Sequence, residues 1–327
     1  MNSFGTIFKI SIFGESHGAN VGVVIDGVPA GLLINSKDFI IDLDRRKSGA
    51  KGTTSRKEED VPNVISGVFN NHTTGTPITI LFSNSNINSK DYDFLKEFHR
   101  PGHADFVTSK KFKGFDDYRG GGHSSGRITL GLVAAGVIAK KIISPIKIES
   151  KIIEVGGDVN IEEAVEKALK EKDSIGGIIQ CTAKNMPIGI GEPFFDSLES
   201  VLSHIIFSIP AIKGIEFGAG FAAAKMKGSE HNDCYIDTIG KTRTNNAGGI
   251  NGGISNGNDL VFKVAVKPTS SIQKIQNTMN FKTGKMSDLN IPGRHDACIA
   301  LRMPVIVEAA TAIALADLLM LDKAHSI

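Results

Sequence analysis

Alternating apolar and polar positions predict β-strands in the first quarter of the chain. The runs from Thr6 to Phe13 and from Val21 to Asp26 flank a short glycine-containing segment, as the two strands of a hairpin do. Two further runs, Val64 to Phe69 and Pro77 to Phe82, lie on either side of a polar segment. We assign His72 within that segment to a turn.

Helical spacing of apolar residues predicts helices after these strands. Ser36 is a candidate N-cap for a helix that runs to Arg46. A long apolar helix is expected from Ile128 to Ile143, and a last one from about Pro304 to Leu321. The remaining predictions are capped helices that begin near Asn160 and Asp196 and strands at Ile146 to Val155, Gly176 to Ala183, Lys213 to Ala224 and Leu260 to Val266.

Composition and length indicate a globular protein. The chain has 327 residues, of which 41% are hydrophobic and 22% charged, so it can bury a large core. This length allows two average domains or a single large α/β or α+β unit. The net charge of +2 is too small to indicate nucleic-acid binding, so any anion site must be local.

Cysteine usage and the amino terminus indicate the compartment. Cys181, Cys234 and Cys298 are far apart and lack CxxC spacing, so neither a disulfide framework nor a zinc site is expected. The first residues show no basic segment followed by an apolar one, and no run of 18 uncharged apolar residues occurs. We therefore expect a cytoplasmic protein without a metal, a membrane partner or a nucleic-acid partner.

The loop of the first hairpin, Gly14-Glu15-Ser16-His17-Gly18, carries more chemistry than a turn requires. An ordinary hairpin loop reaches positive φ with Asn-Gly or Asp-Gly, which would explain the two glycines but not Glu15 or His17. We favour a functional site over a plain turn.

Two later segments have a similar density of polar groups. Arg100-Pro-Gly-His-Ala-Asp105 places a cation, an imidazole and a carboxylate within six positions. The loop from Gly120 to Arg127 places three glycines and two serines before a helix, where free N–H groups attract anions; a serine N-cap after a flexible loop is the simpler alternative. Arg127 favours the anion, because a cation at this end opposes the helix dipole.

Glycine-rich and basic loops add further candidates. Ser48 to Arg56 suits contact with a phosphate or a nicotinamide nucleotide, although a solvated charged loop explains it equally well. Asn245 to Asn258 holds five glycines and five asparagines, which permit the close backbone approach that a flat cofactor or a phosphate requires. A disordered linker is the less favoured alternative, because a strand resumes at Leu260.

The cations in these contexts predict a small substrate with several carboxylates and phosphates. They are Arg46, Lys51, Arg100, Arg127, Lys267 and Arg294. His17 and His103 can act as acids near neutral pH, and Asp296 can anchor or assist a base. The usual nucleotide, zinc and serine-hydrolase motifs do not occur in the sequence.

Six segments, in order along nearly the whole chain, resemble chorismate synthases. They are Phe13-Gly-Glu-Ser-His-Gly18, Asp42-Leu-Asp-Arg-Arg46, Arg100-Pro-Gly-His-Ala-Asp105, Gly120-Gly-Gly-x-Ser-Ser-x-Arg127, Lys267-Pro-Thr-Ser-Ser271 and Arg294-His-Asp296. The resemblance implies a single α+β domain over residues 1–327, a β-α-β sandwich that forms a homotetramer. It also implies a lyase of aromatic amino-acid biosynthesis that eliminates phosphate from 5-enolpyruvylshikimate 3-phosphate, with reduced FMN and no net redox change.

The resemblance also assigns roles to residues of this chain. His17 resembles the acid for the leaving phosphate, His103 the acid near flavin N1, and Asp296 the residue that works with flavin N5 in taking the proton. The implied substrate contacts are Arg46, Lys51, Arg100, Arg127 and Arg294. The implied FMN contacts are His123, Ser124, Ser125, Pro210, Ala211, Gly252, Lys267, Pro268, Thr269, Ser270, Ser271 and Arg294.

Two questions remain open at the level of sequence. The source of electrons is expected to be an external flavin reductase, with NADPH as a possible reductant near Arg46 and Lys51. A non-catalytic flavin-binding or nucleotide-binding module built on the same loops is the alternative function. Such a module would have no need to bring His17, His103 and Asp296 together with the arginines, so their placement distinguishes the two.

Overall fold

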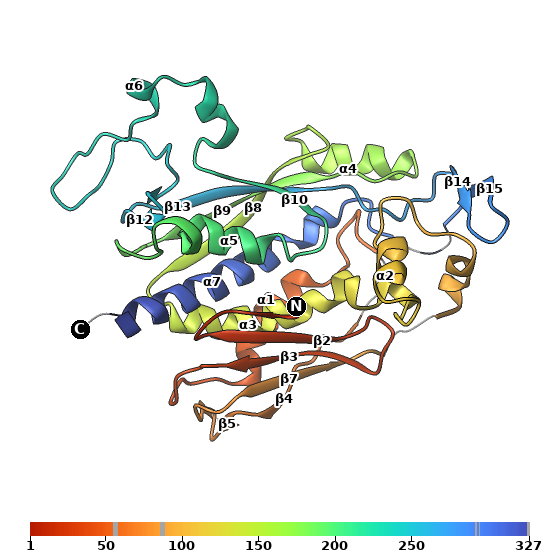
Figure 1. Ribbon diagram of the computed structural model, residues 1–327, viewed down its shortest axis with the longest axis horizontal. Helices are drawn as coiled ribbons and strands as arrows, with labels where there is room; N and C mark the ends of the chain where they lie inside the picture. The colour runs from red at the N-terminus through yellow and green to blue at the C-terminus, as the bar shows by residue number, and fades with distance from the viewer. Residues whose placement is uncertain (55–57, 86–88, 292, 294, 326–327) are drawn as a thin grey trace.

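The chain folds as two antiparallel sheets with a layer of helices between them (Figure 1). The computed structural model describes residues 1–54, 58–85, 89–291, 293 and 295–325. The arrangement is the α+β, β-α-β sandwich expected from the sequence.

The first sheet contains the predicted hairpin. Its strands are β1 (Ser3–Phe4), β2 (Lys9–Gly14), β3 (Asn20–Asp26), β4 (Asn63–Ser66) and β7 (Ile78–Ser83), in the order β1-β2-β3-β7-β4. Neighbouring strands are all antiparallel. Alternate residues of β3 and β7 are buried, among them Val23 and Ile80, so one face of this sheet packs against the helices.

The second sheet lies on the other side of the helices. Its strands are β8 (Lys147–Val155), β9 (Gly177–Lys184), β10 (Ile212–Phe217) and β13 (Leu260–Val266), in the order β10-β13-β9-β8. These neighbours are also antiparallel. Strand β9 buries Ile179, Cys181 and Ala183 at alternate positions, which is the pattern of a strand with one face in the core.

Four helices form the middle layer: α1 (Ser36–Arg46), α3 (Thr129–Ile142), α5 (Leu198–Ile206) and α7 (Pro304–His325). Helix α3 packs against the first sheet, and α7 packs against the second sheet and against α3. The two helices approach closely, since a Cβ atom at Gly136 would lie 2.4 Å from Cβ of Ala309. Helix α7 has the length and hydropathy of a membrane span, but 78% of its apolar window is buried, as in a core helix.

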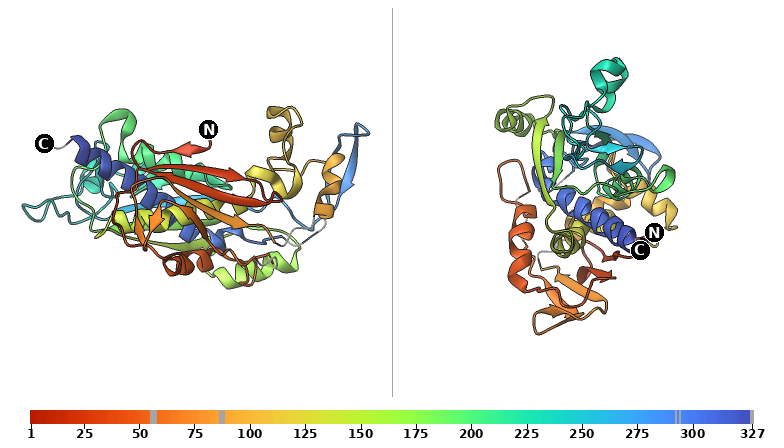
Figure 2. Two further views of the ribbon diagram at one scale, coloured as in Figure 1. Left: turned by 90° about the horizontal axis from the view of Figure 1, so that it is seen from below. Right: turned by 90° about the vertical axis from the view of Figure 1, so that its left-hand side faces the viewer.

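Smaller elements surround the sandwich. They are β5 (Val68–Phe69), β6 (His72–Thr73), α2 (Asp105–Lys111), α4 (Ile161–Lys170), α6 (Gly228–His231), β11 (Ile250–Asn251), β12 (Ile254–Ser255), β14 (Gln276–Asn280), β15 (Lys285–Leu289) and the short 3₁₀ turns η1 (Ser89–Lys96), η2 (Arg119–Ser124), η3 (Gly126–Ile128), η4 (Phe194–Asp196), η5 (Gly220–Lys225) and η6 (Ile299–Arg302). The segment around α6 projects from one end of the sandwich, and α2 with the β14–β15 hairpin lies at the other (Figures 1 and 2).

Three local predictions were wrong. Asn35, not Ser36, is the N-cap of α1, because its side chain accepts from the backbone of Lys37 while Asp38 accepts from the N–H of Asn35. Ser197, not Asp196, caps α5 through the N–H of Ser200. His72 lies in the short strand β6, which pairs with β5.

The prediction for residues 213–224 was correct only in part. The first half forms β10, whereas Gly220–Lys225 is the 3₁₀ turn η5. The N-cap of α4 is Asn160, as predicted, with its side chain accepting from the N–H of Glu163.

Candidate active site

Two neighbouring cavities lie beside the glycine-rich η2–η3 segment. The larger has a volume of about 850 Å³ and the smaller about 500 Å³. They share the residues Gly120, Ser125, Gly126, Thr269, His295, Asp296 and Ile299. A ligand in one cavity would therefore lie next to a ligand in the other, with Asp296 on the common wall.

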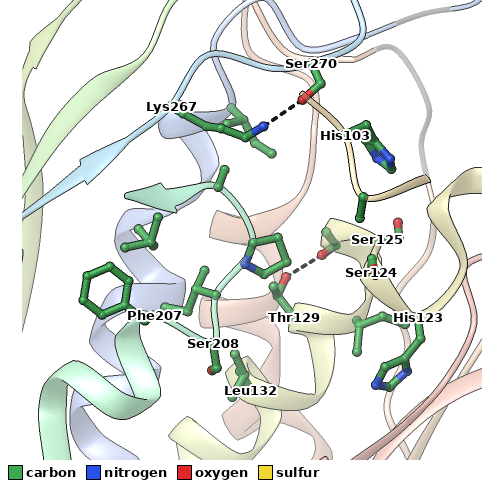
Figure 3. A pocket seen from close by; sticks show the side chains of 18 of the residues that line it. His103, His123, Ser124, Ser125, Thr129, Leu132, Phe207, Ser208, Lys267 and Ser270 are labelled. Atoms are coloured by element: carbon green, nitrogen blue, oxygen red, sulfur yellow. Dashed lines mark hydrogen bonds between the residues drawn. The ribbon is translucent and has the colours of Figure 1, made fainter. Parts of the chain in front are cut away.

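Residues from six separate segments of the chain line the larger cavity, and Figure 3 shows part of this lining. Most of the predicted cofactor residues are among them: His123, Ser124, Ser125, Pro210, Ala211 and the whole run from Lys267 to Ser271. Lys267 Nζ donates to Ser270 Oγ at 2.8 Å and to the carbonyl oxygen of Gly102. Burial and the charge of Lys213, which also lines the cavity, lower the pKa of Lys267.

The lining of the larger cavity is mixed in polarity. One part is apolar and includes Ile10, Leu132 and Ile205, whereas the lysines and the serine and threonine hydroxyls provide donors. Thr269 Oγ1 is buried and has no hydrogen-bond partner among the described residues. This combination suits a ligand with a flat apolar part and an anionic part.

Three successive glycines of η2 bring the backbone close to both candidate acids. Gly120, Gly121 and Gly122 have φ values of +61°, +81° and +54°, a conformation that favours glycine. A Cβ atom at Gly120 would lie 2.7 Å from His17 Nε2, and one at Gly121 would lie 3.1 Å from His103 Cε1. The glycine run is therefore required for the imidazoles to approach this loop.

His103 belongs to a buried charge cluster at the start of α2. Its Nδ1 lies 2.6 Å from Asp105 Oδ1, and Arg100 donates to both oxygens of the same carboxylate at 2.8 Å. Burial alone would raise the pKa of Asp105, but the hydrogen bonds and charges of Arg100 and His103 hold it well below its usual range. Arg100 also donates to Ser271 Oγ at 3.1 Å, which connects this cluster to the 267–271 segment.

The smaller cavity is rich in arginine. Arg46, Arg127 and Arg302 line it, together with Asp60 and Asp296. Asp60 accepts from both Arg46 and Arg127, and Arg302 lies 3.5 Å from Asp296 Oδ1. The Nε atoms of Arg46 and Arg302 are buried and have no partner among the described residues, so these side chains retain donors for an anion.

His17 lies at the edge of this cavity rather than in its lining. His17 is 4% exposed, and its ring packs edge-on against Tyr92, with 5.1 Å between ring centroids. Its neighbours Ser16, Tyr92 and Gly120 all line the cavity. The Arg100 guanidinium lies 5.8 Å from the centroid of the same tyrosine ring, so Tyr92 lies between the two sites.

Some predicted site residues lie elsewhere. Lys51 is exposed, lies 3.5 Å from Glu166 and lines neither cavity. Gly252 is in the turn between β11 and β12, and none of residues 245–258, all of which the structure describes, lines either cavity. Arg294 lies outside the described residues.

The glycines of residues 245–258 have a structural explanation. A Cβ atom at Gly249 would lie 2.5 Å from the carbonyl oxygen of Asp259, and one at Gly253 would lie 2.6 Å from that of Glu192. The close backbone approach predicted for this segment therefore occurs within the chain itself.

Sequence reasoning missed Asp60, Tyr92 and Arg302. Asp60 lies in a stretch of charged residues, Lys57 to Asp60, that reads as a solvated surface. Its backbone φ of +53° and its burial became visible only in the structure. Arg302 lies two positions before the start of the last predicted helix, between Leu301 and Met303. A cation between apolar residues at a helix start is a sequence signal that could have identified it as a candidate for anion binding.

Comparisons with known proteins identify the family of the chain. The family model described as chorismate synthase matches residues 8–320. A chorismate synthase of Chitinophaga pinensis is 62% identical over 99% of this chain and 98% of the relative. Relatives with the same name from Dehalococcoides mccartyi and Methanocaldococcus jannaschii are 49% and 43% identical, over 97% and 98% of this chain and 96% of each relative.

A solved structure gives the same fold. The crystal structure of a chorismate synthase superposes with a TM-score of 0.75, covers 98% of this chain and 93% of its own, and is 24% identical. The family-model match over nearly the whole sequence and the 62% identity show that the chain belongs to the chorismate synthase family, whose members are carbon–oxygen lyases.

Proposed function

We propose that the chain eliminates phosphate from 5-enolpyruvylshikimate 3-phosphate to give chorismate, in the shikimate pathway of aromatic amino-acid biosynthesis. In this 1,4-anti elimination a C–O bond to phosphate and a C–H bond break, a new double bond forms, and phosphate and a proton leave. The observation that carries the proposal is the shared wall of the two cavities, where Asp296 lies between an arginine-rich site and a larger site of mixed polarity.

Reduced FMN is the proposed ligand of the larger cavity. The apolar side chains near Leu132 suit the ring system, while Lys267 and the hydroxyl of Thr269, which has no partner in the described part of the chain, suit its polar edge and phosphate. When bound there, reduced FMN would supply electron density for the departure of phosphate without a net redox change. The proposed contacts are His123, Ser124, Ser125, Pro210, Ala211 and residues 267–271.

The arginines of the smaller cavity would bind the substrate anions. Arg46 and Arg127 have their guanidinium groups fixed on Asp60, and Arg302 extends the positive surface toward Asp296. Planar guanidinium groups recognise carboxylate and phosphate oxygens through paired hydrogen bonds. Arg100 differs from these arginines, because two of its nitrogen atoms already donate to Asp105. We therefore propose that it holds the Asp105 carboxylate in place beside His103 and does not bind the substrate.

Three residues would move or hold protons. His17, at the edge of the arginine-rich cavity, would protonate the leaving phosphate. Asp296 on the common wall would assist removal of the ring proton. His103 would hold a proton beside the larger cavity, with its Nδ1 2.6 Å from Asp105 Oδ1.

Several wider features belong to the same proposal. We place the enzyme in the cytoplasm as one domain over residues 1–327 that assembles as a homotetramer. Exposed aromatic side chains such as Phe194, Phe195 and Phe221, at 87%, 93% and 84% exposure, support contacts between subunits. An external reductase would supply the reduced flavin, with NADPH as the ultimate reductant.

A non-catalytic flavin-binding or nucleotide-binding module is the second candidate. It does not account for the placement of His103 and Asp296 in the same connected space as Arg46 and Arg127. A module that only bound a flavin would not need an arginine-rich cavity beside it.

An anaerobic assay tests the proposal. Enzyme and 5-enolpyruvylshikimate 3-phosphate are mixed with oxidised FMN or with FMN reduced by light, and chorismate is measured per flavin. We expect many turnovers for each reduced flavin and none with oxidised FMN. Equal rates with both forms, or one chorismate for each flavin consumed, would contradict the proposed mechanism.

A further inference from the structure

A single buried carboxylate joins the two arginines of the smaller cavity. Asp60 Oδ2 accepts from Arg46 Nη2 at 2.7 Å, and Asp60 Oδ1 accepts from Arg127 Nη1 at 2.5 Å. The side chains are 1% exposed for Asp60 and 5% for each arginine. Each guanidinium therefore donates one hydrogen bond to the same carboxylate, and this shared acceptor fixes the separation of the two guanidinium groups.

Neighbouring groups complete the orientation of Arg127. Its Nε donates to Asn84 Oδ1 at 2.7 Å, and Nη2 donates to the carbonyl oxygen of Ser83 at 3.2 Å. Asn84 in turn donates to the carbonyl oxygens of Glu15 and Gly18. Arg127 is therefore held between the end of β7, the first hairpin loop and Asp60.

The backbone of Asp60 is in an uncommon conformation. Its φ is +53°, a region that aspartate tolerates better than most residues but that still costs free energy relative to an extended conformation. The strained backbone directs the carboxylate into the cavity instead of outward to solvent. Such strain persists where the surrounding contacts compensate for it, here two charge-assisted hydrogen bonds.

We propose that Asp60 is a positioning residue that spaces and orients Arg46 and Arg127 for the anionic groups of the substrate. The inference rests on the proposed function, because it assigns these arginines to the same substrate. It adds a residue that does not touch the substrate itself and that acts only through the two guanidinium groups.

Because Asp60 is negatively charged, the direction in which substrate affinity changes when this charge is removed tests the inference. By Coulomb interaction alone, a carboxylate in the cavity repels an anionic ligand, so removing its charge would tighten binding. Positioning predicts the opposite result, because two buried guanidinium groups without a shared counter-ion repel each other and move apart. Burial already lowers the pKa of Arg46 to about 10, while Asp60 acts to raise it, so the pair depends on this carboxylate.

The first experiment compares Asp60→Asn with the matched control Glu58→Gln. Asparagine suits the left-handed backbone at position 60, and Glu58 is another carboxylate in the lining of the same cavity, with Ser85 as a hydrogen-bond partner. Binding of 5-enolpyruvylshikimate 3-phosphate and of inorganic phosphate is measured by calorimetry without flavin. We expect Asp60→Asn to weaken substrate binding about tenfold or more, and Glu58→Gln to leave it unchanged or to tighten it.

A second background keeps the test valid if Asp60→Asn alone does not fold. The variant Arg46→Met removes one of the two arginines, so that Arg46→Met with Asp60→Asn has the net charge of the original trio. The double variant is expected to bind the substrate more weakly than Arg46→Met alone, because Arg127 has lost its anchor. Turnover at saturating substrate is expected to fall less than kcat/KM in every asparagine variant.

The outcomes separate this inference from the proposed function. If the unchanged protein binds neither anion, the proposed substrate site is wrong. If the unchanged protein binds the substrate and Asp60→Asn binds it equally well or more tightly, the positioning role is wrong and the substrate site stands. If Asp60→Asn folds, weaker binding by this variant supports the role; if it does not fold, weaker binding by the double variant than by Arg46→Met supports it, and equal or tighter binding overturns it.

Discussion

The Nδ1 atom of His103 lies 2.6 Å from Oδ1 of Asp105, two residues further along the chain. Because Arg100 and His103 keep the pKa of Asp105 low despite its burial, this carboxylate is ionised and can only accept hydrogen bonds. His103 Nδ1 therefore carries a hydrogen and donates it to Asp105. The other ring nitrogen, Nε2, remains for proton exchange beside the larger cavity.

The first prediction concerns the stability that Asp105 provides. Asp105→Asn is expected to lower the free energy of unfolding at pH 7 by about 3 to 5 kcal/mol, because it leaves the buried Arg100 without its counter-ion. The measurement is urea unfolding followed by circular dichroism.

The pH dependence of the same variant has a defined sign. The folded-state pKa of Asp105 is depressed, so its contribution is present above the unfolded-state value of about 3.9 and is lost as pH falls through the folded-state value. The difference between wild type and variant should be constant above about pH 5 and shrink below about pH 4. A difference that grows on acidification would be inconsistent with an ionised Asp105.

The second prediction concerns the two candidate acids. His17→Ala and His103→Ala are each expected to reduce kcat by on the order of 10²- to 10⁴-fold, the usual effect of losing a general acid. His72→Ala is the matched control, since His72 is exposed in β6 and lines neither cavity. A folded His17 or His103 variant with full turnover would remove that residue from the mechanism.

Local sequence patterns predicted most of the fold because periodicity reflects burial on one face. The β2–β3 hairpin and helices α3 and α7 lie where the apolar runs placed them. Helix caps were less predictable, because Asn35 and Ser36 are adjacent and both are good N-cap residues. Only the geometry of the first turn, with Asp38 bonding back to Asn35, distinguishes them.

The site was predictable where a motif is continuous and not where partners are distant. His103, Asp105 and Arg100 lie within one segment, so their density was visible in the sequence. Asp60 meets Arg127 across 67 positions, and no local pattern reports such a contact. The Asn245–Asn258 segment shows the converse error, because glycines that allow close approach to a ligand equally allow close approach to the chain's own backbone.

The third prediction concerns Arg127. Arg127→Ala is expected to raise KM for the substrate about tenfold or more, since a charge-assisted hydrogen bond is worth about 1.5 to 3 kcal/mol. Arg127→Lys should recover the charge but only part of the affinity, because the ammonium lacks the planar fork that contacts Asp60 and Asn84 together. Arg243→Ala, an exposed arginine near α6, is the control. Unchanged KM and kcat in a folded Arg127→Ala enzyme would contradict the assignment.

The fourth prediction concerns the contact between the glycine run and His17. In Gly120→Ala, the new Cβ would lie 2.5 Å from His17 Cδ2 and 2.8 Å from Ser16 Oγ, so the imidazole must shift. Because a proton donor displaced by about an ångström loses much of its effect, we expect kcat to fall by on the order of 10²-fold while flavin binding persists.

Backbone strain is a competing explanation for that loss, since Gly120 has a φ of +61°. Gly114→Ala separates the two causes, because Gly114 has a φ of +79° and a Cβ there would meet nothing within 4 Å. Both variants carry the conformational cost of a left-handed alanine, but only Gly120→Ala moves the histidine. The midpoint temperature of thermal unfolding should therefore fall in both variants, whereas kcat should fall only in Gly120→Ala. Equal losses of kcat in the two variants would assign the effect to strain and leave the position of His17 without a catalytic consequence.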